Sequence, residues 1–376
     1  MISPKFTCEF FQRKGINFFT GVPDSLLKDF CAYITDNVPN QNHLIAANEG
    51  NAIALATGYY LGTGKPSLVY LQNSGLGNIV NPILSLADKE LYKIPLIILL
   101  GWRGEPGIKD EPQHIKQGRI TPKLLEALEL NWFEIGPQLK NTENTLIKAF
   151  ESMEESQSPT IILVRKGSFS KYSLKKDQSS NYTLTREKAI KTTLSNINNK
   201  DLVISTTGMA SREVFEHRVE LGENHNRDFL TVGSMGHTSS IALGLAISRS
   251  DRNIICLDGD GSVLMHLGSM AIQGVLGLSN FVHIVLNNAA HDSVGGQPTV
   301  AQDINLPLIA KNCGYKHIAS VDSSEGLKEK LKQFLPLNTG PKLIEVLVKK
   351  GSRMNLGRPT KTPLYNKNEF MANIIN

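Results

Sequence analysis

The feature that most constrains the fold is a regular alternation of short apolar runs with segments of helix length. Each run has the length of one buried strand, and the gaps between runs have room for a helix. Strands separated by helices form parallel sheets covered on both faces. We therefore predict an α/β fold with doubly wound parallel sheets. The runs are 17–19, 43–46, 67–71, 95–100, 132–135 and 160–164 in the first half, and 201–205, 229–232, 254–257, 281–286, 317–320 and 343–348 in the second.

The order of elements is the same in the two halves, which predicts two domains built on one plan. A polar segment rich in Lys and Ser, near 167–185, lies between them and is the predicted linker. We place the domains at residues 1–170 and 185–376, with no room for a third domain between them. Ligands of doubly wound sheets bind outside the carboxyl ends of the strands, so the residues that follow each strand are the candidates for a site.

Composition narrows the class of partner. The formal net charge is only +5, so we expect no nucleic acid, whereas a small anionic metabolite suits a mildly basic chain. The sequence has no run of 18 apolar residues, which predicts no membrane span. Residues 1–15 favour an amphipathic helix over a signal peptide. The four cysteines lack metal or redox spacing, and we expect buried free thiols in the cytoplasm.

Acidic and amide side chains follow two apolar runs of the second half. The run 254–257 is followed by the residues DGDG, and the run 281–286 is followed by NN. The segment between them has room for one helix and one return strand. The two strand ends can therefore be neighbours, and side chains of Asp260 and Asn288 can converge there. Hard oxygen ligands in small number suit Mg²⁺, which keeps positions for water and phosphate oxygens.

The glycines of this segment suit a phosphate group. Gly259 and Gly261 let the backbone approach a phosphate closely, and a helix beginning at Ser262 would direct its free N–H groups to it. A metal held by the acids would then hold a diphosphate. Two ordinary strand-end turns are the alternative.

The arrangement of strand, GDG, helix, strand and NN resembles the thiamine diphosphate-binding motif of the decarboxylase and acetolactate synthase superfamily. The resemblance implies thiamine diphosphate and Mg²⁺ as cofactors, with Asp260, Asn288 and the backbone carbonyl of Ala290 as metal ligands. The segment "VGSMGHTSSIALGLA" is similar to the one whose bulky residue bends the cofactor, although its Met235 also suits core packing. Together with the three residues named above, the expected cofactor contacts are Thr207, Gly208, Met209 and Met235.

A glutamate in the first half supports the same resemblance. Glu49 follows the run 43–46 and opens a helix of small residues, like the glutamate segment of this superfamily. There the carboxylate bonds a pyrimidine nitrogen of the cofactor and so promotes removal of the thiazolium proton. The alternative is that Glu49 only favours a helix N-terminus by its charge. Because Glu49 and the metal ligands lie on different predicted domains, the resemblance implies a homo-oligomer with active sites at subunit interfaces.

Several segments are similar to the family of phosphonopyruvate and sulfopyruvate decarboxylases. They include "GVPDSLLKDF", "QNSGLGNIVNPILSLAD", "NNAAHDSVGGQPT" and "GSRMNLGRPT". The chain carries both predicted domains and has "DEPQH" at 110–114, which favours 3-phosphonopyruvate as substrate and a place in phosphonate biosynthesis. A sulfopyruvate decarboxylase, a thiamine diphosphate-dependent carboligase and a non-enzymatic nucleotide-binding protein stay open as alternatives. The last would not need Glu49, and no Walker-type motif is present.

Decarboxylation of this substrate requires a proton donor and a site for an anionic tail. Asp24 and His114 are the candidate acids, while Asp24 could instead cap a helix and His114 could be an exposed loop residue. His291 and Asp292 are weaker candidates. Arginine offers a bidentate fork to a phosphonate, although most charged loop residues are only solvated. The candidate substrate contacts are Ser25, Arg103, Arg353 and Arg358, with Lys109 as a further basic residue.

Overall fold

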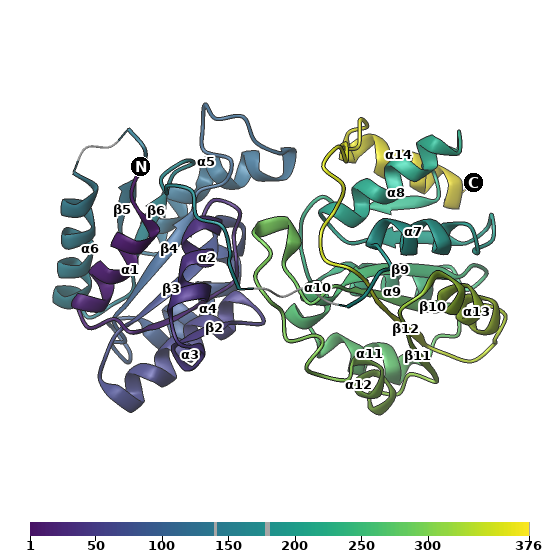
Figure 1. Ribbon diagram of the computed structural model, residues 1–376, viewed down its shortest axis with the longest axis horizontal. Helices are drawn as coiled ribbons and strands as arrows, with labels where there is room; N and C mark the ends of the chain where they lie inside the picture. The colour runs from purple at the N-terminus through teal and green to yellow at the C-terminus, as the bar shows by residue number, and fades with distance from the viewer. Residues whose placement is uncertain (139–140, 177–180, 376) are drawn as a thin grey trace. The chain divides into compact units, whose positions relative to one another are not determined.

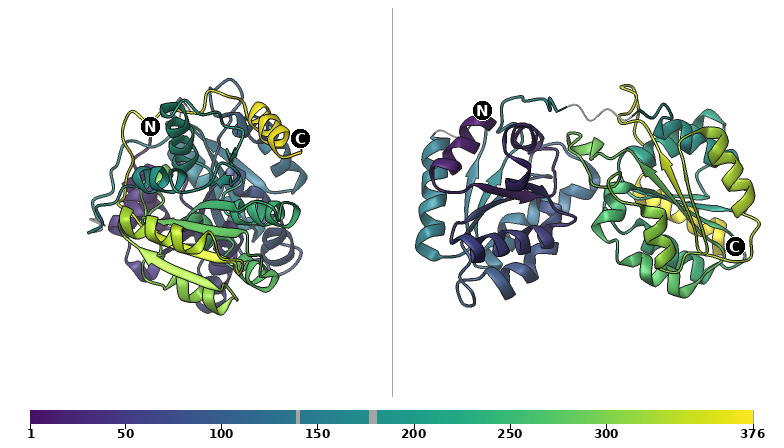
Figure 2. Two further views of the ribbon diagram at one scale, coloured as in Figure 1. Left: turned by 90° about the vertical axis from the view of Figure 1, so that its right-hand side faces the viewer. Right: turned by 60° about the horizontal axis from the view of Figure 1, so that its bottom comes forward.

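The computed structural model describes residues 1–138, 141–176 and 181–375. The chain divides into two compact units, which we call unit 1 (residues 1–177 with 291–297) and unit 2 (residues 178–290 and 298–376). Each unit contains one six-stranded sheet, and helices lie on both faces of each sheet (Figure 1; Figure 2, right). The predicted α/β fold of two doubly wound parallel sheets is confirmed. The described residues form no third domain.

Unit 1 begins with an amphipathic helix, as predicted for residues 1–15, and then alternates strands with helices. Its strand order is β2-β1-β3-β4-β6-β5, and every pairing is parallel. The elements are α1 (Pro4–Arg13), β1 (Phe18–Gly21), α2 (Lys28–Asn37), η1 (Asn40–Asn42), β2 (His43–Ile45), α3 (Glu49–Thr63), β3 (Ser67–Gln72), η2 (Asn73–Gly75), α4 (Leu76–Pro82), η3 (Ile83–Ala87), β4 (Leu96–Gly101), α5 (Pro112–Ala127), β5 (Asn131–Ile135), α6 (Thr142–Ser156) and β6 (Thr160–Val164).

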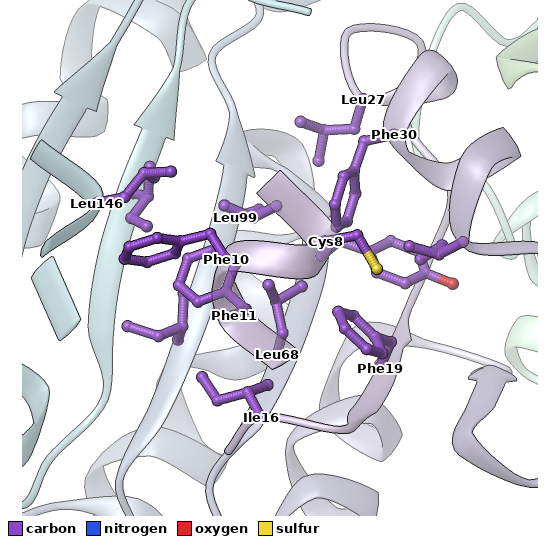
Figure 3. Close-up of a cluster of buried hydrophobic side chains, with 14 of the residues drawn as sticks. Cys8, Phe10, Phe11, Ile16, Phe19, Leu27, Phe30, Leu68, Leu99 and Leu146 are labelled. Atoms are coloured by element: carbon purple, nitrogen blue, oxygen red, sulfur yellow. The ribbon is translucent and has the colours of Figure 1, made fainter. Parts of the chain in front are cut away.

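Two apolar clusters cover the two faces of this sheet. One joins the strands to α1, α2 and α6, and the other joins them to α3, α4 and α5. Figure 3 shows the first cluster, where Phe11 of α1 and Phe30 of α2 lie beside Leu68 and Leu99 of the sheet. Every residue of β4 is buried, because a central parallel strand is covered on both faces. That is why its sequence is continuously apolar rather than alternating.

Unit 2 repeats the plan with the strand order β11-β12-β10-β9-β7-β8, again with parallel pairings throughout. Helices α7, α8 and α13 cover one face, and α9, α11, α12 and α14 contribute to the cluster on the other. The elements are α7 (Arg186–Leu194), β7 (Leu202–Ser205), α8 (Met209–Glu220), β8 (Asp228–Leu230), α9 (Thr238–Ser248), β9 (Ile254–Gly259), α10 (Asp260–Met265), α11 (Ser269–Leu276), β10 (Phe281–Asn287), η4 (Asp292–Val294), α12 (Leu306–Asn312), β11 (His317–Val321), α13 (Ser324–Phe334), β12 (Lys342–Leu347) and α14 (Pro363–Ile375).

The first part of the predicted linker packs on unit 1. The backbone N–H of Tyr172 donates to Asp29 Oδ1 over 2.9 Å, and those of Lys175 and Lys176 donate to the carboxylate of Asp36. Residues 177–180 of that segment lie outside the described residues. The domain boundaries at 170 and 185 stay a prediction.

All four cysteines are free thiols, as predicted. Cys8, Cys31 and Cys256 are buried, but the prediction of burial is wrong for Cys313, which is half-buried because it caps the exposed end of α12. Among the described helices, none combines the length and apolar character that crossing a membrane would require. The cytoplasmic location stays a prediction.

Candidate active site

The two strand ends that carry the polar motifs of unit 2 are neighbours, as the sequence predicts. Strands β9 and β10 pair in parallel, with Gly259 opposite Leu286. The carboxyl ends of both strands therefore lie at one edge of the sheet, and the residues after them meet there. This edge brings Asp260, the first residue of α10, close to Asn288 in the loop after β10.

Asp260 is buried and is the first residue of α10. The helix begins two residues before the predicted start at Ser262, so the carboxylate belongs to its first turn. Asp260 Oδ2 accepts a hydrogen bond from Thr299 Oγ1 over 2.5 Å. Burial raises the pKa of Asp260 to about 6. A divalent cation would favour the ionised form of such a buried carboxylate, so the donor set fits a metal.

The loop after β10 presents the second pair of predicted ligands. Asn288 is buried, and its Oδ1 accepts from the N–H of Ala290 over 3.0 Å. Between them Ala289 has a φ of +54°, a left-handed conformation that a non-glycine residue adopts only under constraint. Pro298 forms a single antiparallel bridge with Ala290, which holds the loop from the other side. Asn288 and the backbone of Ala290 are thus held together in the loop that follows β10.

The two acids of the DGDG motif have different surroundings. Asp258 is the fifth residue of β9 and points into the core, where its Oδ2 lies 3.5 Å from Nε2 of His283 on β10. Its Oδ1 accepts from the N–H of Gly259. Because the strand ends at Gly259 and α10 begins at Asp260, the alternation of side chains along β9 does not continue to Asp260. Only Asp260 of this pair is placed for a ligand at the sheet edge.

Ser262 connects the predicted cofactor segments. Its Oγ accepts from the N–H of Gly236 over 3.1 Å and from Thr206 Oγ1 over 3.4 Å. The hydrogen bond from Gly236, the residue after Met235, places the predicted cofactor segment beside α10. The hydrogen bond from Thr206 places the residues after β7 beside α10 as well. Thr207 and Gly208 follow Thr206, and Met209 begins α8. Thr206 was missed by the sequence reasoning, because the apolar pattern gives no reason to choose it over Thr207.

Glu49 is buried at the start of α3 in unit 1. Asn78 Nδ2 donates to Glu49 Oε2 over 2.7 Å. A Cβ atom at Gly75 would lie 2.3 Å from Glu49 Oε1, so the absence of a side chain there makes room for the carboxylate. The N-cap hydrogen bond of α3 is made by Asn48, which accepts from the N–H of Asn51. Sequence reasoning missed Asn78 and Gly75, which contact Glu49 only in the folded chain.

Asp24 is fully buried three residues after the end of β1. Its Oδ1 accepts from Gln72 Nε2 over 2.6 Å, and its Oδ2 accepts from the N–H groups of Leu26 and Leu27. The alternative that Asp24 caps a helix is wrong, because the N-cap of α2 is Leu27 without a side-chain cap hydrogen bond, and Asp24 instead holds the turn that precedes the helix. This contact leaves room for a second role, because burial raises the pKa of Asp24 above its usual value. A carboxyl group with a raised pKa is suited to donating a proton.

Arg103 lies half-buried in the same part of unit 1. Its guanidinium forms a bidentate pair with Asp110, in which Nε donates to Oδ2 over 2.8 Å and Nη2 donates to Oδ1. Nη1 donates to Ser25 Oγ over 2.7 Å. Burial alone would raise the pKa of Asp110, but the hydrogen bonds from Arg103 outweigh it and hold that pKa below its usual range. The structure thus brings the predicted residues Ser25 and Arg103 together, and adds Asp110.

His114 is buried in the first turn of α5, so the alternative of an exposed loop histidine is wrong. Burial and the nearby charge of Arg103 lower the pKa of His114. A Cβ atom at Gly104, where φ is +70°, would lie 1.9 Å from the carbonyl oxygen of His114. This close approach holds the Arg103 loop against α5 and explains the glycine.

The remaining predicted basic residues are Arg353 and Arg358 of unit 2 and Lys109 of unit 1. Arg353 donates from Nε to Glu187 of α7 over 3.2 Å and also pairs with Glu216 of α8. Glu216 accepts in addition from the N–H of Gly357. These contacts attach the segment 353–357 to the helices, which is a structural role. Arg358 and Lys109 are exposed, while His291 and Asp292 are half-buried.

Comparison with known proteins assigns both units. Residues 6–124 match the thiamine pyrophosphate enzyme N-terminal TPP-binding domain, and residues 207–346 match the C-terminal TPP-binding domain of the same enzymes. The chain is 34% identical to a phosphonopyruvate decarboxylase of Streptomyces viridochromogenes over 95% of this chain and 91% of that protein. It is 33% identical to one from Streptomyces hygroscopicus (93% and 88%) and 30% identical to a sulfopyruvate decarboxylase of Methanosarcina acetivorans (92% and 90%).

Proposed function

This chain belongs to the thiamine pyrophosphate enzymes, and from that premise we propose that it decarboxylates 3-phosphonopyruvate to phosphonoacetaldehyde and CO₂. The observation that carries the choice of substrate is the similarity to two phosphonopyruvate decarboxylases over nearly the whole chain. Over nearly the whole chain a sulfopyruvate decarboxylase is 30% identical, against 33–34% for the two phosphonopyruvate decarboxylases, and sulfopyruvate is the second candidate. A separate subunit of another sulfopyruvate decarboxylase is 38% identical, but over only 40% of the chain. Because phosphonoacetaldehyde retains the carbon–phosphorus bond, the reaction suits phosphonate biosynthesis.

The residues of unit 2 fit the cofactor and its cation. Asp260 Oδ1, Asn288 Oδ1 and the carbonyl of Ala290 would hold Mg²⁺ at the edge of the sheet. The segments joined by Ser262 would line the thiamine diphosphate. When bound, thiamine diphosphate supplies an electron sink for the pair of electrons that stays behind when CO₂ leaves. The number of hard oxygen donors suits a cation that also binds diphosphate oxygens and water.

Two carboxyl groups of unit 1 would move protons. Glu49 would hold a proton at its carboxylate and share it with the pyrimidine ring of the cofactor, in the position that Asn78 and Gly75 define. Asp24 would hold a proton because of its raised pKa and donate it to the substrate carbon after CO₂ has left. His114, whose pKa is lowered, would be neutral and orient the substrate.

The substrate tail would bind at Arg103. Its pair with Asp110 fixes the plane of the guanidinium, and one N–H on each of Nη1 and Nη2 is left to face an anion. Arg353 is a weaker candidate because two glutamates already take its charge. Arg358 stays a candidate as an exposed cation.

Replacing Arg103 by alanine is expected to lower kcat/KM for phosphonopyruvate by roughly tenfold to over a hundredfold, since a charge-assisted hydrogen bond contributes about 1.5–3 kcal/mol. Slow turnover of pyruvate, which has no phosphonate, should change little. Steady-state kinetics with both substrates measures the ratio. Arg119→Ala, at an exposed arginine of α5, is the matched control and should leave the ratio unchanged. An equal loss for both substrates in Arg103→Ala would show that Arg103 supports structure or cofactor instead.

We also expect a homo-oligomer whose active sites form between subunits. Glu49 lies in unit 1 and Asp260 in unit 2, and helices of both units expose large apolar side chains, such as Leu61 (73%) and Val275 (85%). Glu49→Gln and Asp260→Ala proteins, each inactive alone, should regain activity after being dissociated and reassociated together. Each variant treated alone is the control. A monomer in analytical ultracentrifugation, or mixed oligomers without activity, would contradict this arrangement.

The test of the overall function is a comparison of three substrates. Release of CO₂ should be measured for phosphonopyruvate, sulfopyruvate and pyruvate, with and without thiamine diphosphate and Mg²⁺. Phosphonopyruvate is expected to have the highest kcat/KM, and omission of either cofactor should abolish turnover. A higher kcat/KM for sulfopyruvate would replace the proposed substrate.

A further inference from the structure

Thr299 contacts both loops of the proposed cation site. Its hydroxyl donates to Asp260 Oδ2 over 2.5 Å, and its backbone N–H donates to the carbonyl of Ala289 over 2.9 Å. The first contact reaches the first residue of α10, directly after β9, and the second reaches the loop after β10. Thr299 itself is buried. One residue therefore connects the two segments that would supply the metal ligands.

The direction of the hydroxyl hydrogen follows from its surroundings. Thr299 Oγ1 accepts a hydrogen bond from the N–H of Ala301 over 3.3 Å. An ionised carboxylate can only accept, so the hydroxyl must donate to Asp260. The β-branched side chain of threonine has few χ1 rotamers, which keeps the hydroxyl in this direction. Asp260 Oδ2 thereby receives the hydroxyl hydrogen, backbone N–H groups of Gly261 and Asn288 also reach this carboxylate, and Oδ1 is the atom that we assign to the cation.

The backbone around Thr299 is held independently of Asp260. Asn287 Nδ2 donates to the carbonyl of Ala301 over 3.2 Å and to Glu345 Oε1 over 2.8 Å. On the other side, Pro298 bridges to Ala290. Both anchors belong to the sheet or to the loop at its edge. The position of Thr299 therefore does not depend on Asp260, and its hydroxyl can hold the carboxylate in one orientation.

We propose that Thr299 is a positioning residue that makes Asp260 a single-oxygen ligand and so favours Mg²⁺ over Ca²⁺ at this site. Mg²⁺ demands near-ideal octahedral geometry with oxygen atoms at about 2.0–2.1 Å, whereas Ca²⁺ accepts longer bonds and bidentate carboxylates. A carboxylate whose second oxygen is held by a hydroxyl meets the requirement of the smaller ion. The proposal rests on the proposed function, since it assumes that Asp260 holds the cation.

The test measures cation binding without catalysis. Binding of Mn²⁺ in the presence of thiamine diphosphate is followed by electron paramagnetic resonance, and Mg²⁺ or Ca²⁺ is added to displace it. Thr299→Val keeps the shape of the side chain and removes the hydroxyl. We expect it to weaken Mg²⁺ binding by about 10- to 100-fold, the usual effect of losing a hydrogen bond to a metal ligand. Ca²⁺ binding should weaken less, so that the preference for Mg²⁺ falls.

Two further variants separate positioning from structure. Thr299→Ser keeps the hydroxyl and should bind both cations within a few-fold of the unchanged protein. Thr193→Val removes a buried hydroxyl of α7 that donates to the carbonyl of Ala189, and should leave both affinities unchanged. An unchanged Mg²⁺ affinity in Thr299→Val, or an equal loss for both cations, overturns the positioning role. Failure of the unchanged protein to bind Mn²⁺ overturns the proposed cofactor site, and the role of Thr299 with it.

Discussion

Asp260→Ala is expected to abolish the Mg²⁺-dependent binding of thiamine diphosphate while leaving the fold intact. The substitution removes the one charged ligand that we propose for the cation, and the cation would hold the diphosphate. The fold should persist, because the carboxylate is buried with a raised pKa and its removal relieves a desolvation cost. Among the side chains that the structure describes, Thr299 loses this acceptor, as do the backbone N–H groups of Gly261 and Asn288.

Calorimetric titration of thiamine diphosphate with and without Mg²⁺ measures this effect. Asp303→Ala, which removes an exposed carboxylate at a nearby position in the sequence, is the matched control and should bind normally. Circular dichroism should show the same secondary structure for both variants. Unchanged cofactor affinity in Asp260→Ala would mean that the diphosphate is held without this carboxylate, and the proposed metal site would be wrong.

Glu49→Gln is expected to bind thiamine diphosphate normally and to lose its ability to activate it. The amide has nearly the same shape, and Asn78 can still donate to its oxygen. It cannot hold and return a proton as a carboxylate does. Exchange of the thiazolium proton of the bound cofactor for deuterium should slow by about a hundredfold or more, on the usual scale of general acid–base catalysis. Quenched-flow exchange followed by nuclear magnetic resonance measures the rate.

Two glycines near Glu49 provide a graded version of this experiment. Gly75→Ala would place a Cβ atom against the carboxylate and push it from its position, so exchange should slow with Glu49 still present. A Cβ atom at Gly77 would have no neighbour within 4 Å. Gly77→Ala is therefore the control and should exchange at the normal rate. If Glu49→Gln exchanges as fast as the unchanged protein, Glu49 serves only the N-terminus of α3.

Local patterns in the sequence were sufficient to predict the elements of the fold. The twelve strands of the described residues lie within a few residues of the predicted runs. The central strands, such as β4 and β10, are buried on both faces and are therefore predominantly apolar. Helices were placed less accurately where a side chain alters the start. Asp24 binds the N–H groups of Leu26 and Leu27, so α2 begins only at Lys28, after a turn. The start of α10 also differs from the prediction: the helix begins at Asp260, two residues before the predicted start at Ser262.

The sequence by itself determined which residues stand at the carboxyl ends of the strands, including Asp260 and Asn288, since that position depends only on where each apolar run stops. The tertiary structure decided which side chains meet. The contacts of Thr299 with Asp260, of Asn78 with Glu49 and of Arg353 with Glu216 join residues 39, 29 and more than a hundred positions apart. These contacts form because the packing of strands and helices brings distant segments together. No periodicity or spacing in the sequence predicts which residues will meet in this way.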